Sequence, residues 1–115
     1  MKPDIKTLAK TTHSWDGSPL PSSSDGSAEV TILKITIPAG TRLEPHTHPM
    51  INAGYVMKGK LTVIAADGKE CTFSAGDTIV EMVNRVHYGE NHGSKDVELL
   101  MFYCGTEGQT LSIPS

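Results

Sequence analysis

The chain has 115 residues, which is enough to bury a hydrophobic core without disulfide bonds and fits one domain. Charged residues make up 20% of it and the net charge is −3, with no block of like charge, so the composition predicts neither nucleic-acid nor membrane partners. No apolar run reaches the length of a transmembrane span, and residues 1–10 lack the apolar core of a signal peptide. We therefore expect a cytoplasmic protein.

Residues 1–28 are polar and interrupted by proline, glycine and a serine run, which predicts a loop-rich arm rather than a separate domain. The arm contains the only tryptophan, Trp15, and one isolated histidine, His13. We expect Trp15 to pack on the following domain, on a second subunit or over the mouth of a site, because an exposed indole is unfavourable. His13 is expected to lie in solvent.

Residues 29–115 contain many short segments rich in β-branched residues and separated by glycine, proline and aspartate turns. No segment keeps a helical period over three turns. The pair Asp67–Gly68 predicts a type I′ hairpin turn. The pattern indicates an all-β sandwich or barrel, of which the jelly roll is the version that encloses a ligand pocket. The expected strands cover residues 29–37, 41–48, 52–58, 60–66, 70–73, 78–83, 86–90, 97–104 and 111–114.

Two histidines in the second of these strands are candidate metal ligands. His46 and His48 are two residues apart, so both side chains point to one face of an extended strand, and Arg42 and Glu44 share that face if the strand has no bulge. Neutral imidazole is a good ligand for transition metals, and His87 in a later glycine-led segment offers a third. Inward positions of a small barrel are normally apolar, so inward imidazoles need a reason such as a metal. The alternative is that the pair lies on the surface of a hairpin.

The residues around this pair resemble the first sequence motif of the cupin superfamily, which is a glycine, two histidines, a glutamate and a second glycine at fixed spacing. Gly40, His46, His48 and Gly59 occupy these positions. Asn52 stands where the family has glutamate.

A second cupin motif follows in the chain. Gly76, His87 and Asn91 match it, whereas Met82 replaces a proline and Asn84 replaces a glycine. With the strand pattern, the resemblance extends over roughly residues 29–113. It implies a cupin-type jelly-roll β-barrel, also called a double-stranded β-helix, as a single domain over residues 29–115.

The resemblance implies that His46, His48 and His87 bind one divalent transition metal ion, which is Fe, Mn, Ni, Cu or Zn. The amide oxygen of Asn52 would be a fourth ligand that binds weakly, binds through water, or only forms hydrogen bonds. Because asparagine is neutral, the site would keep its full divalent charge. An open cation of this kind favours an anionic or chelating oxygen ligand.

Three functions of different classes are compatible with such a site. The first is a metal-dependent enzyme, either dioxygenase-like or a Lewis-acid isomerase or decarboxylase, acting on a small oxygen-rich molecule. The alternative is a non-catalytic module that binds or senses a sugar or organic acid, and a structural or metal-storage role is a third possibility. The candidate catalytic side chains are Arg42, Glu44, Tyr55 and Glu81. The alternatives are that Arg42 is solvated, that Glu44 lies at the rim, and that Tyr55 and Glu81 simply pack.

The remaining expectations concern cysteines and partners. Cys71 and Cys104 are too few for a disulfide framework, and each is expected to be a small buried residue. His92 is expected in an exposed loop. Cupins of this size usually pair, so the resemblance implies a homodimer that binds a small molecule.

Overall fold

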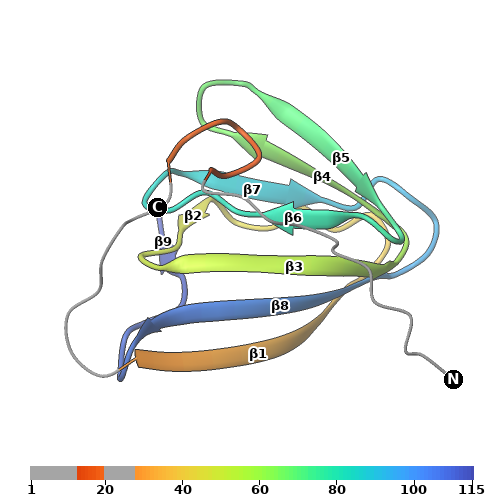
Figure 1. Ribbon diagram of the computed structural model, residues 1–115. Helices are drawn as coiled ribbons and strands as arrows, with labels where there is room; N and C mark the ends of the chain where they lie inside the picture. Colours follow the sequence, from red (N-terminus) through yellow and green to blue (C-terminus); the bar gives the residue numbers. More distant parts are fainter. Residues whose placement is uncertain (1–12, 20–27) are drawn as a thin grey trace, which may run out of the picture.

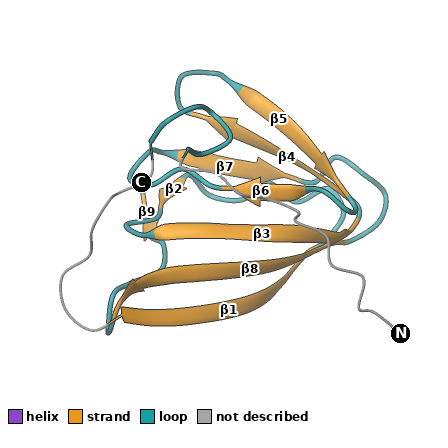
Figure 2. Cartoon of the chain, in the orientation of Figure 1, coloured by secondary structure: helices purple, strands orange, loops and turns teal. Residues whose placement is uncertain are grey.

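The computed structural model describes residues 13–19 and 28–115, whose regular structure consists of strands and no helices (Figure 1, Figure 2). Every strand lies within or close to a predicted one. Their bounds are β1 (Ala28–Ile37), β2 (His46–Thr47), β3 (Ile51–Lys58), β4 (Lys60–Ala65), β5 (Glu70–Ser74), β6 (Thr78–Val80), β7 (His87–Glu90), β8 (Val97–Thr106) and β9 (Ile113–Pro114).

The strands form two antiparallel sheets. One has the order β1-β8-β3-β6 and the other the order β5-β4-β7-β2-β9. The longest pairing joins β1 to β8, from Ala28 opposite Thr106 to Ile37 opposite Val97, and the two run side by side in Figure 1. Most neighbours within each sheet are distant in sequence. The all-β prediction is confirmed, and the two sheets form the predicted jelly roll.

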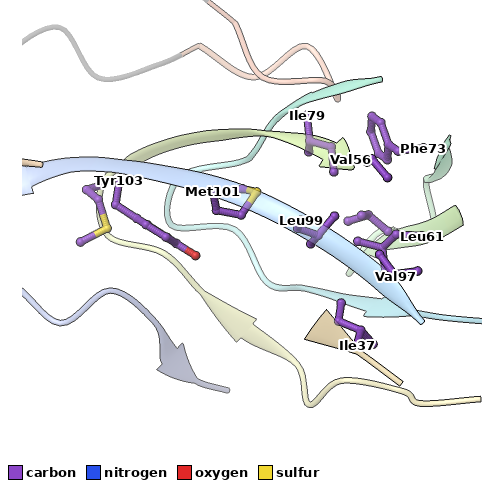
Figure 3. Close-up of a cluster of buried hydrophobic side chains, with 11 residues drawn as sticks. Ile37, Val56, Leu61, Phe73, Ile79, Val97, Leu99, Met101 and Tyr103 are labelled. Atoms are coloured by element: carbon purple, nitrogen blue, oxygen red, sulfur yellow. The ribbon is translucent and has the colours of Figure 1, made fainter. Parts of the chain in front are cut away.

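The hydrophobic core lies between the two sheets, as Figure 3 shows for its buried side chains. Strand residues alternate between the two faces of a sheet, and β8 follows this rule: Leu99, Met101 and Tyr103 are buried, whereas Phe102 and Cys104 are exposed. Fully burying one such apolar side chain contributes about 1.5–3 kcal/mol. Because β8 is apolar on both faces, only the fold decides which face becomes core.

The predicted strand over residues 41–48 is wrong in most of its length. Only His46 and Thr47 form a strand, and an isolated bridge pairs Arg42 with Glu90. Leu43 lines the interior and so does His46, although they are three residues apart, so the alternation of faces is interrupted between them. Pro45 lies in this interruption and cannot donate a ladder hydrogen bond.

The turn between β4 and β5 also differs from the prediction. A type I′ turn needs positive φ at both central residues, but only Gly68 has one, at 91°. The Gly68 N–H donates to the Ala65 carbonyl at 3.0 Å, and the Ala65 N–H donates to the Lys69 carbonyl at 2.8 Å. These bonds describe a three-residue loop in which a tight turn is followed by one left-handed glycine.

The prediction that both cysteines are buried is wrong. Cys71 is half-buried on β5, an outermost strand of its sheet, and Cys104 is exposed on the outer face of β8. Both are free thiols. Their small apolar side chains gave no indication of which strand face they occupy.

Residues 13–19 pack on the domain beside the end of β6, with Trp15 against the hydrophobic core. The backbone N–H of Trp15 donates to the backbone carbonyl of Val80 at 2.9 Å, and the indole meets the Phe73 ring edge-on with centroids 6.2 Å apart. Asp16 forms an ion pair with Arg85 at 3.1 Å. Of the three positions predicted for Trp15, the structure shows packing on the domain. The other residues of the predicted arm, 1–12 and 20–27, lie outside the described residues.

Across the ranges that the structure describes, no helix is long and apolar enough to cross a membrane.

Candidate metal site

A cavity of about 250 Å³ lies between the two sheets. Its wall is mainly leucine, isoleucine, valine and methionine side chains, and no lysine or arginine of the described chain lines it. A pocket of this size is below the about 300–1,000 Å³ of typical ligand sites, so it suits a small molecule. The polar side chains that line it are His46, His48, Asn52, Glu81, His87, Tyr103 and Ser112.

Three histidines from β2, the residue after it, and β7 meet at this cavity. His46 pairs directly with His87 across the two strands, and His48 follows two residues after His46. Their ring centroids are 4.6–5.0 Å apart, and one potential ligand atom from each lies within 4.8 Å of the others. His48 and His87 are buried and His46 is half-buried. The structure therefore brings together the three histidines that the sequence singled out.

The orientation of all three rings is set by hydrogen bonds to the backbone. A carbonyl can only accept, so each Nδ1 is the donor, and in the neutral tautomer each Nε2 carries the lone pair. This outer contact is the usual way in which proteins orient a histidine that binds a metal. The Nδ1 atoms of His46, His48 and His87 donate to the carbonyls of Glu44, Leu111 and Arg85, at 2.7, 2.8 and 2.9 Å.

Asn84 turns the chain so that β7 can enter the sheet. It is the only non-glycine of the described chain with a positive φ, at 58°, a conformation that asparagine tolerates better than most residues. Its N–H donates to the His48 carbonyl at 2.8 Å, which links the segments before His87 and after His46. Asn84 thus supplies a left-handed backbone conformation at the position where the second motif has a glycine.

Two buried polar atoms of the described chain have no hydrogen-bond partner: His87 Nε2 and Asn52 Oδ1. Leaving such an atom unpaired costs about 1–3 kcal/mol, so native proteins rarely do so without a reason. Asn52 is fully buried, and its Nδ2 donates to the Met50 carbonyl at 3.2 Å, which leaves the amide oxygen free. Both atoms are lone-pair donors on residues that line the cavity. This donor set fits a metal ion.

The electrostatics of the cavity favour the neutral form of His48. Burial, together with the nearby charges of His87 and His46, lowers the pKa of His48 to about 4, against the opposing effect of its bond to the Leu111 carbonyl. His48 is therefore neutral at pH 7, as a metal ligand must be. Burial also raises the pKa of Tyr103, whose ring lies 5.8 Å from that of His48, and the charge of Glu81 adds to this.

Glu81 is the one candidate catalytic residue that the structure places in the cavity. It follows directly after β6, and its side chain is 8% exposed. Oε1 accepts hydrogen bonds from the Trp15 indole N–H at 2.9 Å and from the Met82 N–H at 3.2 Å. Oε2 lies 3.6 Å from His87 Nε2.

The other three candidates lie outside the cavity. Arg42 is 64% exposed, and its guanidinium lies 4.5 Å from the Tyr88 ring centroid. The Glu44 side chain is exposed, so the prediction that Arg42 and Glu44 share the histidines' face is wrong, because the alternation of faces is interrupted after Leu43. Tyr55 lies on the outer face of β3, opposite in parity to the buried Asn52 and Gly54.

Sequence reasoning missed three contacts that build the site: the indole N–H on Glu81, the Leu111 carbonyl on His48, and Tyr103 beside His48. The first two partners are 66 and 63 residues apart in the chain. No local pattern signals such contacts. His13 and His92 lie on the surface, and His92 contacts Glu90 there.

Comparisons with known proteins agree with this architecture. A family model described as "Cupin domain" matches residues 33–103. An uncharacterised conserved protein with a double-stranded β-helix domain from Klebsiella pneumoniae is 16% identical, with 99% of both chains covered and a TM-score of 0.63. A search of curated proteins gave no match.

Two enzymes are also among the similar structures. DMSP lyase DddQ from Ruegeria pomeroyi is 17% identical with a TM-score of 0.66, and 86% of this chain covers 47% of that one. An oxalate oxidase is 27% identical with a TM-score of 0.56, and 64% of this chain covers 41% of that one. The chain thus spans less than half the length of either enzyme.

Proposed function

The chain belongs to the cupin domain family, and on that premise we propose that His46, His48 and His87 bind one divalent transition metal ion. The observation that carries this proposal is the shared orientation of the three rings: each Nδ1 is tied to a carbonyl, which leaves the Nε2 atoms available at one cavity. The unpartnered Nε2 of His87 is the clearest single atom in support. Imidazole donors suit Fe, Ni, Cu and Zn, and Mn is also a candidate.

We further propose that the site acts as an enzyme on a small oxygen-rich molecule. A bound ion supplies Lewis acidity, and for a redox-active metal also electron transfer, at positions that the histidines leave open. The protein supplies an apolar wall that holds the rest of the substrate and excludes water. Because no lysine or arginine of the described chain lines the cavity, recognition of an anionic or chelating substrate would fall to the ion.

One of the similar structures supports this substrate class. The oxalate oxidase that resembles the chain was also solved with the substrate analogue glycolate, at 27% identity over 64% of this chain. Glycolate and oxalate are small acids with neighbouring oxygens. The proposed reactions are those in which two oxygen atoms of the substrate would bind the ion. They are a dioxygenase-like reaction and a Lewis-acid isomerisation or decarboxylation.

A second candidate function is binding without turnover. It is favoured by the position of Arg42, Glu44 and Tyr55, which lie outside the cavity and leave Glu81 as the one carboxylate that lines it among the residues the structure describes. In that case the domain would hold a small acid or sugar at the ion.

Metal analysis tests the first proposal. Protein purified without chelator, and then reconstituted with each metal, should hold close to one equivalent, and His48→Ala or His87→Ala should reduce this strongly. The matched control is His92→Ala, because His92 is exposed and contacts Glu90 rather than the cavity. Less than about one tenth of an equivalent in the wild type after reconstitution would refute the proposal.

Turnover separates the enzyme from the binding module. Metal-loaded protein is incubated with diketones, catechols, thiols and small hydroxy and keto acids while oxygen uptake and products are followed. Catalytic product formation that His48→Ala abolishes supports the enzyme. Stoichiometric ligand binding with no product supports the binding module.

A further inference from the structure

The buried carboxylate of Glu81 has no fixed cation beside it within the described chain. Its side chain is 8% exposed, and the cavity that it lines contains no lysine or arginine. A buried carboxylate is costly unless it is paired with a positive charge. The groups near it are the indole N–H of Trp15, the backbone N–H of Met82 and the ring of His87.

The two oxygens of this carboxylate have different surroundings. Oε1 is held by the Trp15 indole at 2.9 Å and by the Met82 N–H at 3.2 Å. Oε2 lies 3.6 Å from His87 Nε2, which has no hydrogen-bond partner. His87 Nδ1 donates to the Arg85 carbonyl, so in the neutral tautomer, which is the form that binds a metal, Nε2 carries the lone pair and faces Oε2.

Two lone-pair atoms at this spacing repel each other unless something positive lies between them, and either a proton on Nε2 or a metal ion meets that need. Two donor atoms that share one ion, each at about 2.0–2.2 Å from it, are about 3–3.5 Å apart. The 3.6 Å separation between Oε2 and Nε2 is close to this range and longer than a good hydrogen bond.

Position 81 also lies next to the position where the first cupin motif has its glutamate. The backbone N–H of Glu81 donates to the backbone carbonyl of Asn52 at 3.0 Å, and both side chains line the same cavity. Asn52 is neutral, and its Oδ1 is buried without a partner. The chain thus lacks a carboxylate at one position and has one at its neighbour on the adjoining segment.

We propose that Glu81 is the anionic ligand of the metal site, replacing the glutamate that the family motif places at residue 52. Trp15 holds its Oε1, so that Oε2 is presented to the ion beside His87. This inference rests on the proposed metal site. It makes the donor set three imidazoles and one carboxylate, and it reduces the net charge of a divalent site by one.

The test measures Zn²⁺ affinity by competition with a chromophoric chelator and the visible absorption of the Co²⁺-loaded protein. The variants are Glu81→Gln and, as the matched control, Glu70→Gln, which changes an exposed carboxylate on β5. Glu81→Gln keeps a side-chain oxygen that can accept the Trp15 hydrogen bond. We expect it to weaken Zn²⁺ binding about 10- to 100-fold and to shift the Co²⁺ spectrum, whereas Glu70→Gln leaves both as in the wild type.

A charge swap separates a ligand from a structural role. Adding Asn52→Glu to Glu81→Gln restores a carboxylate at the family position, and we expect this double variant to regain affinity. If the double variant folds, as judged by circular dichroism, and regains none, Glu81 is not acting as a ligand. An affinity and a Co²⁺ spectrum of Glu81→Gln that match the control would also overturn the inference while leaving the three-histidine site intact. Failure of the wild type to bind any metal would instead refute the proposed function itself.

Discussion

Trp15 is the residue through which the segment of residues 13–19 reaches the site, and replacing it tests that connection. In Trp15→Phe an aromatic ring remains to pack against Phe73, but the N–H that Glu81 Oε1 accepts at 2.9 Å is lost. A hydrogen bond to a charged group contributes about 1.5–3 kcal/mol. The smaller ring adds a packing loss of about 1 kcal/mol. We therefore expect the metal-free variant to lose about 3 kcal/mol of unfolding free energy.

A double-mutant cycle isolates the hydrogen bond from the packing loss. Trp15→Phe, Glu81→Leu and the double variant are unfolded with urea in the presence of chelator, so that metal binding does not contribute. The coupling free energy between positions 15 and 81 should be about 1.5–3 kcal/mol. A coupling below about 0.5 kcal/mol would show that the indole does not hold the carboxylate. Asp16→Ala, which removes the ion pair with Arg85, should show no such coupling to position 81.

Three further predictions concern the fold, its pH dependence and its assembly. Gly54→Ala should lower the free energy of unfolding by about 3 kcal/mol and the melting temperature by about 10 °C, because a Cβ there would lie 2.5 Å from the backbone oxygen of Leu100. A loss of unfolding free energy under about 1 kcal/mol by calorimetry would contradict this packing. Burial lowers the pKa of His48 to about 4, below the about 6.5 of an unfolded chain, so the native state takes up this proton less readily than the unfolded state. The free energy of unfolding of the metal-free protein should therefore fall by about 2 kcal/mol as the pH is lowered from 7 to 5. Urea unfolding of His48→Gln should lack this component, and an unchanged pH dependence would show that another group is responsible. We propose that the expected homodimer uses the outer face of β1 and β8, where Ile32 and Phe102 lie opposite each other and are 55% and 42% exposed. Light scattering should then give a dimer mass that Phe102→Asp reduces to a monomer, and a monomeric wild type at micromolar concentration would refute the dimer.

The sequence alone determined the fold class and the three histidines. Period-two alternation and turn residues act over a few neighbours, so strand positions such as β3 and β4 could be predicted to within one or two residues. The spacing of His46 and His48 follows from the geometry of an extended chain, and a family motif added His87. Each of these inferences depends either on interactions between residues close in sequence or on residues at the spacing of a known family motif.

Only the tertiary structure decided which side chains enter the cavity. Arg42 and Glu44 have the parity of the histidines in the sequence, but a local interruption after Leu43 turns them to solvent. Glu81 was one weak candidate among four until its contacts with Trp15 and His87, from distant segments, singled it out. A carboxylate's role depends on its burial and on the charges around it, and in a jelly roll these come from strands that are adjacent in space and far apart in the chain.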